Sequence, residues 1–296
     1  MGLLSKIFGR KGGDGRSLDE LAARLGMSAP DLRAVAVEYR EFTVPKRDGS
    51  TRTIAAPSAD LKRVQKLVLR RVLGRLKSHE AALGFERGLS FVDHARFHAG
   101  SAVIVRMDIR DFFPSTTQKR VAEYLSAIGW GKEAVAELTR LCCRARALPQ
   151  GAPTSPRLAN LVNQEMDARL AGAAHHYGAA YSRYADDIVF SFPSDEPRRA
   201  RALVGLARLI LSESGYTLNR RKGPRVLRAH QRQTVTGLVV NGGPPRLARE
   251  VRRWLRAVEH RAGGGSTNGK IPTLTATQLA GWRALAGMVE ARRRGA

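Results

Sequence analysis

Two apolar, β-branched segments that each reach an aspartate constrain the fold of this chain most strongly. Residues 102–109 read AVIVRMDI, which is typical of a buried strand, and Asp108 closes the apolar run. Residues 180–192 read AYSRYADDIVFSF, which predicts two strands joined by a turn that contains Asp186 and Asp187. Strand ends can meet in one sheet, so we expect these three carboxylates to lie close together.

Three clustered carboxylates make a hard oxygen site of the kind that suits Mg²⁺. Two such ions about 4 Å apart can activate an attacking hydroxyl and stabilise the leaving oxygen in phosphoryl transfer. Asp108, Asp186 and Asp187 are therefore the candidate catalytic and metal-binding residues, with two Mg²⁺ ions as the expected cofactor. Each acid taken singly is more simply explained as a solvated turn residue, so the prediction depends on the set.

The charge balance predicts a polyanionic partner. The 296 residues include 51 Lys and Arg against 26 Asp and Glu, a formal net charge of +25 with a pI near 11.3. No apolar run approaches the length of a membrane span, which favours nucleic acid over a membrane. The N-terminal segment lacks the features of a secretory signal, and the two cysteines are adjacent at Cys142 and Cys143, so we expect a reducing cytoplasm.

Apolar periodicity and turn residues divide the chain into elements. A basic tail precedes two short helices over 18–25 and 31–39, and a hairpin over 42–57 turns at Asp48-Gly49. A further strand is expected over 234–241. Helices are expected over 61–76, 118–129, 133–145, 156–171, 198–215, the region around 247–258, and 274–294.

Three motifs occur in a fixed order around the aspartates: DIRDFFPS from Asp108, LPQGAPTSP over 148–156, and YADD over 184–187. As an ordered set they resemble the polymerase core of reverse transcriptases. The resemblance implies an α+β, right-hand polymerase fold with fingers, a palm built on an antiparallel sheet, and a short helical thumb. It divides the chain into a basic tail and helical pair (1–40), fingers and palm (41–240), and a basic helical thumb (241–296).

Within that family the chain most resembles the bacterial retron enzymes. The segments DFFPS, LPQGAPTSP, RYADDIVFS and VTG (235–237) are of retron style. Retron enzymes also carry an N-A-x-x-H signature before the first catalytic strand, whereas this chain reads His94-Ala95-Arg96-Phe97-His98. The change from Asn to His leaves open whether His94 and His98 contact RNA or pack in the interior.

The resemblance assigns roles to residues around the metals. Lys46 and Arg52 flank the hairpin tip and are expected to clamp triphosphate oxygens, although a solvated basic turn would look the same. The remaining nucleotide-binding candidates are Asp111, Phe112, Phe113 and Gln150. Phe113 would lie under the sugar and exclude a 2′-hydroxyl, while one of the two phenylalanines could be ordinary core. Gln150 would contact the nucleotide or the template pair, unless it simply begins a helix.

Basic residues after the palm helix and in the C-terminal section are expected to follow template and primer phosphates. Any one of them alone is equally explained as part of a solvated helix face. The residues are Arg220, Arg221, Lys222, Arg225, Arg228, Arg249, Arg252, Arg253 and Arg256.

The expected function is RNA-directed DNA synthesis by a retron reverse transcriptase. Membership would imply a cognate structured noncoding RNA as template and as primer through an internal 2′-hydroxyl, dNTPs as substrates, and a branched RNA–DNA product (msDNA) that carries the cDNA. It would further imply a role in antiphage defence with an accessory effector protein. The alternatives are another bacterial reverse transcriptase, of group II intron-like or abortive-infection type, and a catalytically silent RNA-binding scaffold.

Overall fold

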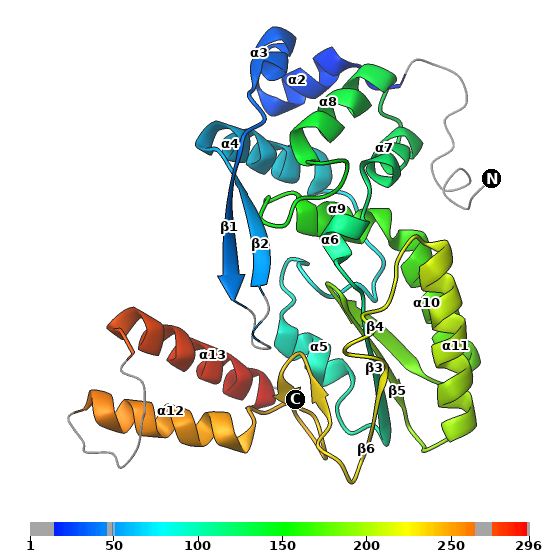
Figure 1. Cartoon of the computed structure of the whole chain (residues 1–296), viewed down its shortest axis with the longest axis vertical. Helices are drawn as coiled ribbons and strands as arrows, with labels where there is room; N and C mark the ends of the chain where they lie inside the picture. Colours follow the sequence, from blue (N-terminus) through cyan, green and yellow to red (C-terminus); the bar gives the residue numbers. More distant parts are fainter. Residues whose placement is uncertain (1–14, 46–48, 50, 264–273, 295–296) are drawn as a thin grey trace.

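The computed structural model describes residues 15–45, 49, 51–263 and 274–294, and the α+β architecture expected from the sequence is present in them (Figure 1). Its centre is a four-stranded antiparallel sheet with strand order β4-β5-β3-β6. The strands are β3 (Val103–Asp108), β4 (Ala180–Tyr184), β5 (Asp187–Phe192) and β6 (Arg225–Arg228). The predicted strands at 102–109 and 180–192 are therefore confirmed.

Alternation along β3 assigns one face of the sheet to each of two cores. Val103, Val105 and Met107 belong to the main core, which also holds the inner faces of α10 (Gln164–His176) and α11 (Pro197–Glu213). Ile104 belongs to a second core together with Val189 of β5. Both faces are thus covered, which explains why the strand reads as a continuous apolar run.

The second core is completed by elements far apart in the chain. Its members come from α5 (Phe91–Phe97), from the short strands β7 (Thr234–Val235) and β8 (Leu238–Val239), and from Val289 of α13 (Ala276–Arg294). The Oγ1 hydroxyl of Thr236 donates to the carbonyl of Phe91 at 2.9 Å, which joins the hairpin to the start of α5.

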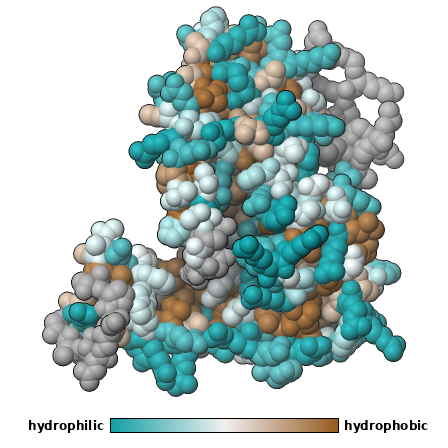
Figure 2. Space-filling model, viewed as in Figure 1, coloured by the Kyte–Doolittle hydropathy of each residue, from teal (hydrophilic) through white to brown (hydrophobic). Residues whose placement is uncertain are grey.

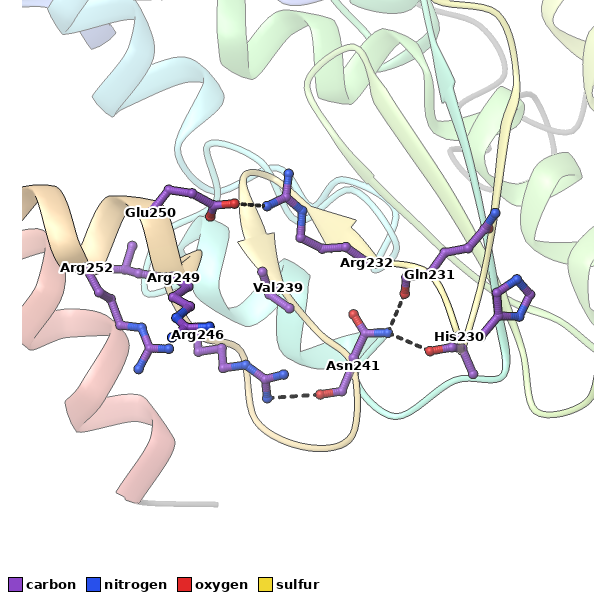
Figure 3. A pocket seen from close by; sticks show the side chains of 11 residues that line it. His230, Gln231, Arg232, Val239, Asn241, Arg246, Arg249, Glu250 and Arg252 are labelled. Atoms are coloured by element: carbon purple, nitrogen blue, oxygen red, sulfur yellow. Dashed lines mark hydrogen bonds and ion pairs between the residues drawn. The ribbon is translucent and has the colours of Figure 1, made fainter.

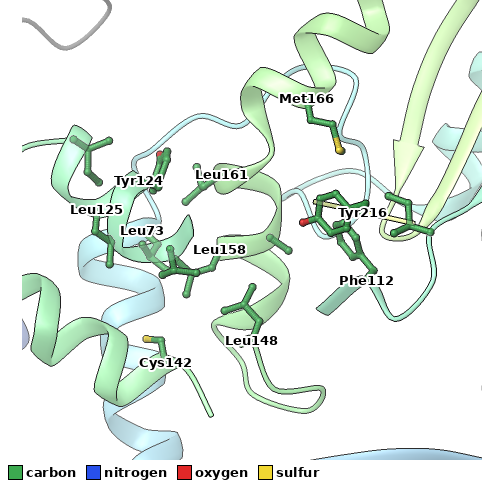
Figure 4. Packing of buried hydrophobic residues seen from close by; sticks show 14 of the residues in the cluster. Leu73, Phe112, Tyr124, Leu125, Cys142, Leu148, Leu158, Leu161, Met166 and Tyr216 are labelled. Atoms are coloured by element: carbon green, nitrogen blue, oxygen red, sulfur yellow. The ribbon is translucent and has the colours of Figure 1, made fainter. Parts of the chain in front are cut away.

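The N-terminal half is a helical layer that carries a long hairpin. Ser17 accepts from the N–H of Glu20 and so caps α2 (Leu18–Leu25), as the sequence indicates. The hairpin pairs β1 (Tyr39–Pro45) with β2 (Thr51–Pro57) and extends away from the helices (Figure 1). The remaining helices of this half are α3 (Ala29–Ala34), α4 (Ala59–Leu67), the π-helix η1 (Val68–Leu73), α6 (Phe112–Ser115), α7 (Gln118–Ala127), α8 (Lys132–Cys142) and α9 (Ser155–Val162). Leucines from η1, α7 and α9 interdigitate in the main core (Figure 4).

Five predicted elements are wrong in extent. The helix expected over 61–76 ends at Leu73, in the π-helix η1, and the helix expected over 133–145 ends at Cys142, because Cys143 is extended. The helix expected to reach residue 39 ends at Ala34, because Val35 is already extended and the chain enters β1 at Tyr39. The helix expected over 156–171 is broken at Asn163, whose amide donates to the carbonyl of Ala159 and to the hydroxyl of Tyr216, each at 2.8 Å. The strand expected over 234–241 is the β7–β8 hairpin, with both turn residues at positive φ.

The C-terminal helices form a pair. Leu255 and Val258 of α12 (Arg249–Ala262) pack against Leu279 of α13, and the Trp254 and Trp282 rings meet edge to face at 4.9 Å. The pair projects from the body, so the surface is recessed between it and the N-terminal half (Figure 2). In the part of the chain that the structure covers, no helix combines the length and apolar character that a bilayer crossing requires.

Candidate active site

The sheet register brings the three predicted carboxylates to one edge. Asp108 at the end of β3 lies opposite Asp187 at the start of β5. Asp186 lies in the tight turn between β4 and β5, and its carbonyl accepts from the N–H of Ile109 at 2.9 Å. Ala185, before it, adopts φ +56°, which a two-residue turn between antiparallel strands requires. The acids therefore meet because of backbone pairing alone.

Burial and neighbouring charges shift the pKa values of Asp186 and Asp187. Burial raises the pKa of Asp186, and repulsion from Asp108 raises it further. Burial also raises the pKa of Asp187, an effect opposed by Arg106, whose Nη2 donates to the Asp187 carboxylate at 2.8 Å. Arg106 is a charged residue within the apolar run of β3. That unusual position is the sequence signal that could have identified it as a partner of the aspartates.

Asp108 is held by two residues of the segment after α11. The side-chain amide of Asn219 donates to its Oδ1 at 3.0 Å, and the ammonium of Lys222 forms an ion pair with its Oδ2. The N–H of Asn219 also donates to the backbone carbonyl of Asp108 at 2.8 Å. Lys222, expected to follow phosphates, thus contacts the catalytic candidate Asp108 instead, while Arg220 and Arg221 beside it are exposed.

Carboxylate oxygens are suitable ligands for a divalent ion, but in this structure two of the three carboxylates are paired with cationic side chains. Among the described residues, no group of three or more His, Cys, Asp or Glu is arranged to hold a metal. Asp187 faces Arg106 and Asp108 faces Lys222, so cationic side chains balance the charge that a metal would balance. The chemistry of the set, three carboxylates on neighbouring strand ends, fits Mg²⁺.

Phe112 and Phe113 are separated by burial. Phe112 is 5% exposed and belongs to the main core, with its ring 5.6 Å from that of Tyr216. Phe113 is only partly buried, and Asp111 before the pair is exposed in the left-handed region at φ +47°. Phe112 is therefore the phenylalanine that belongs to the core. The Phe113 ring is the one that a ligand could contact.

The LPQGAPTSP loop docks on the hairpin. The N–H of Ala55 in β2 donates to the carbonyl of Gln150 at 2.8 Å. Gly151 has φ +129°, and a Cβ there would lie 2.6 Å from the Ala55 carbonyl oxygen, so the contact requires glycine. Arg52 is exposed on β2, whereas Lys46 lies outside the described residues. This contact brings Gln150 and the strand of Arg52 together.

A buried ion pair lies beneath the aspartate turn. Arg183 and Asp167 are both fully buried, and Asp167 accepts from Arg183 Nε at 2.8 Å, from Arg183 Nη2 at 2.5 Å and from the Tyr181 hydroxyl at 2.6 Å. Arg183 Nη1 donates to the carbonyl of Ala185 at 3.0 Å. Through this hydrogen bond the Arg183–Asp167 pair holds the aspartate turn in place. The sequence analysis does not predict this ion pair.

His94 and His98 are interior residues. Both are fully buried, and the ring nitrogens of His98 lie 2.8 Å from the Ser191 hydroxyl and 2.7 Å from the Ser182 hydroxyl. The His94 ring lies 5.7 Å from that of Tyr184. Burial lowers the pKa of His94 to about 3, so the ring is neutral. The question left open by the sequence is answered in favour of packing.

A basic pocket of about 520 Å³ lies where the β7–β8 hairpin meets α12 (Figure 3). Arg249 and Arg252 line it, and Arg232 forms an ion pair with Glu250 at its edge. Its other lining residues are Ala229, His230, Gln231, Val239, Asn241, Arg246 and Leu247. Residues 229–232 follow the end of β6, where Arg228 pairs with Val103 at the start of β3. The pocket therefore lies at the end of the sheet opposite Asp108.

The other predicted phosphate contacts are dispersed. Arg253 and Arg256 are exposed on α12, and Arg256 lines a groove between α12 and α13 that shares Arg252 with the basic pocket. Arg225 is exposed at the start of β6, and Arg228 at its end donates to the carboxylate of Asp195 at 2.7 Å. Arg249, Arg252 and Arg256 therefore line two adjoining hollows that share Arg252, whereas Arg225 and Arg228 lie on β6.

Comparison with known proteins agrees with the motifs. Residues 44–240 match the family described as reverse transcriptase (RNA-dependent DNA polymerase). The chain is 38% identical over 283 residues to the retron Mx162 reverse transcriptase of Myxococcus xanthus, a match that covers 82% of this chain and 58% of that protein. It is 37% identical to the retron Mx65 enzyme of the same organism (83% and 62%) and 38% identical to the retron Ec86 enzyme of Escherichia coli (75% and 69%). The chain thus spans about three fifths of the length of the two Myxococcus relatives.

Proposed function

The chain belongs to the reverse transcriptase family and, within it, to the retron reverse transcriptases, and we propose that it is an RNA-directed DNA polymerase. The observation that carries the proposal is the pairing of Asp108 opposite Asp187, with Asp186 in the adjoining turn. The three carboxylates lie within the ordered polymerase motifs and at the same end of the sheet, which suits nucleotidyl transfer. A protein that only bound RNA would need positive charge there instead. We assign the fingers to the β1–β2 hairpin and its helices, the palm to the four-stranded sheet, and the thumb to α12 and α13.

Asp108 and Asp186 would hold two Mg²⁺ ions, with Asp187 as the third carboxylate. When bound, the ions would supply activation of a primer hydroxyl and stabilisation of the leaving pyrophosphate. Arg106 orients Asp187 through its 2.8 Å contact. Lys222 and Asn219 orient Asp108 through the ion pair and the 3.0 Å hydrogen bond.

The nucleotide would lie between the palm edge and the hairpin. Arg52, together with Lys46, would bind the triphosphate oxygens. Phe113 would lie under the sugar and exclude ribonucleotides, while Asp111 and Phe112 would contribute backbone. Gln150, joined to β2 through the 2.8 Å bond from Ala55, would contact the nucleotide or the template pair.

The RNA would be bound through phosphates by the exposed basic residues, among them Arg220, Arg221 and Arg225 beside the catalytic edge. Arg249 and Arg252, which share the basic pocket, would bind phosphates beyond the opposite end of the sheet. Arg253 and Arg256 would extend that surface along α12. A site at each end of the sheet suits an RNA longer than the templating segment.

The finer expectation is the retron reaction. A cognate structured noncoding RNA would serve as template and as primer, giving branched msDNA from dNTPs, with an accessory effector in antiphage defence. The family membership favours this reaction over that of a group II intron-like or abortive-infection enzyme.

The test uses cells that express the protein with its native upstream DNA, beside the double variant Asp186→Ala with Asp187→Ala. Nucleic acid is extracted, treated with RNase and separated on a denaturing gel before and after debranching. A discrete single-stranded DNA that is absent from the variant and shifts on debranching is expected. Synthesis only on a supplied primer and RNA template would retain the polymerase and reject the retron reaction. Silence in both assays would favour the RNA-binding scaffold.

A further inference from the structure

An irregular segment between η1 and α5 is attached along β4, the strand that leads into the aspartate turn. Ala82 forms a parallel bridge with Arg183, whose N–H donates to the carbonyl of Ala81 at 2.7 Å. The N–H of Leu83 donates back to the carbonyl of Arg183 at 2.9 Å. The segment thus behaves as an extra strand at the edge of the palm sheet, although it has no regular secondary structure.

Both neighbours of Phe85 in this segment are fixed. The Gly84 carbonyl accepts from the amide of Asn160 at 2.7 Å, and a Cβ on Gly84 would lie 2.8 Å from the backbone nitrogen of Ala185. Glu86 forms an ion pair with Arg157 at 2.5 Å, in which both side chains are largely buried. Phe85 is therefore held in place from each side and close against the turn.

Phe85 combines two unfavourable features. Its backbone has φ +65°, a conformation that bulky L-residues rarely adopt, and its side chain is 44% exposed. The ring lies 5.9 Å from that of Tyr184 and 6.2 Å from that of Phe113. The fold thus maintains a strained backbone that leaves an aromatic ring half in solvent, between the residue before the aspartate turn and the proposed sugar-contacting ring.

We propose that Phe85 is a specificity-determining residue of the nucleotide pocket, whose exposed face packs against the sugar and base of the incoming deoxynucleotide. The inference rests on the proposed function. Phe113 would lie under the sugar, and the Phe85 ring extends that apolar surface toward Tyr184. An aromatic face suits a ligand with an apolar sugar edge and a π-surface, and it contacts every base without reading its identity.

The test compares Phe85→Gly, Phe85→Tyr and the control Phe97→Ala with the wild type on a supplied RNA template and DNA primer. Glycine removes the ring and also relieves the positive φ, so the melting temperature should not fall. Phe97 is 54% exposed on α5 and contacts His98 rather than the aspartate turn, which makes it a matched exposed aromatic. Steady-state KM and kcat for dNTPs, ribonucleotide incorporation, and template–primer Kd are measured.

Phe85→Gly should raise the KM for dNTPs about tenfold and lower the preference for deoxynucleotides, with template–primer Kd unchanged. Phe85→Tyr and Phe97→Ala should match the wild type. An unchanged KM and preference in Phe85→Gly would overturn the proposal, as would a weakened template–primer Kd at constant KM, because the ring would then contact the template. A wild type that makes no DNA would overturn the proposed function itself, and the role of Phe85 with it.

Discussion

Removing one partner of the buried Arg183–Asp167 pair should destabilise the protein strongly. In Asp167→Ala the guanidinium loses two hydrogen bonds, from Nε and Nη2, and the Tyr181 hydroxyl loses its acceptor. Arg183 keeps its hydrogen bonds to the Asn160 side chain at 3.3 Å and to the Ala185 carbonyl at 3.0 Å, and its guanidinium stays 5.3 Å from the centre of the Phe112 ring. An uncompensated charge at zero exposure costs about 3–5 kcal/mol.

Urea unfolding measures this loss as a shift of the midpoint at constant m-value. The matched control is Glu133→Ala, which breaks the surface pair with Arg33 and should cost less than about 1 kcal/mol. The double variant Asp167→Leu with Arg183→Met removes both charges and should be more stable than Asp167→Ala. A loss in Asp167→Ala no larger than in Glu133→Ala would refute the reasoning, since it would mean that water or another anion reaches Arg183.

Two further predictions concern charge at the two ends of the sheet. Asp186→Asn should abolish synthesis yet raise the free energy of unfolding at pH 7, because the raised pKa of the Asp186 carboxyl means that its ionised form destabilises the folded protein. This gain in the free energy of unfolding should vanish as the pH falls through the ordinary carboxyl range, where Asp186 becomes protonated in both states. A loss of stability at pH 7 would contradict the prediction. Arg249→Ala with Arg252→Ala should reduce the slope of log K against log salt for RNA binding by about 1.5–2, at constant KM for dNTPs; an unchanged slope would separate the basic pocket from RNA.

The sequence predicts that Asp108, Asp186 and Asp187 lie at the same end of the sheet, because local pattern and global fold agree there. The short, β-branched apolar runs before Asp108 and after Asp187 favour buried strands, and strand pairing then brings the acids to one end of the sheet. The order of motifs adds the hairpin and the loop of Gln150, whose contact with β2 depends on a glycine that the motif itself contains.

The remainder depends on partners distant in sequence. The helix break at Asn163 needs the hydroxyl of Tyr216, which lies 53 residues away. Lys222 reads as one more phosphate-binding cation until tertiary structure places it on Asp108. Phe112 and Phe113 are the same residue type side by side, and only packing decides which one is core.

The opposite problem arises with buried charge. The burial of Arg183 is not evident from the sequence, because its compensating acid Asp167 lies on α10 rather than on a neighbouring strand. The sequence leaves open whether His94 and His98 contact RNA or pack, and only their complete burial identifies them as interior residues. In each case the burial of the polar side chain depends on tertiary packing that the sequence does not reveal.

The second core has a consequence for biosynthesis. One face of the palm sheet is covered by Val92 and Ala95, which are made before β3, but also by Val235 and Val289, which are made long after it. During translation Ile104 and Val189 therefore emerge from the ribosome before Val235 and Val289, which complete their cover. The nascent palm must remain partly open, exposing apolar surface of the kind that chaperones bind, until the last helix has been synthesised.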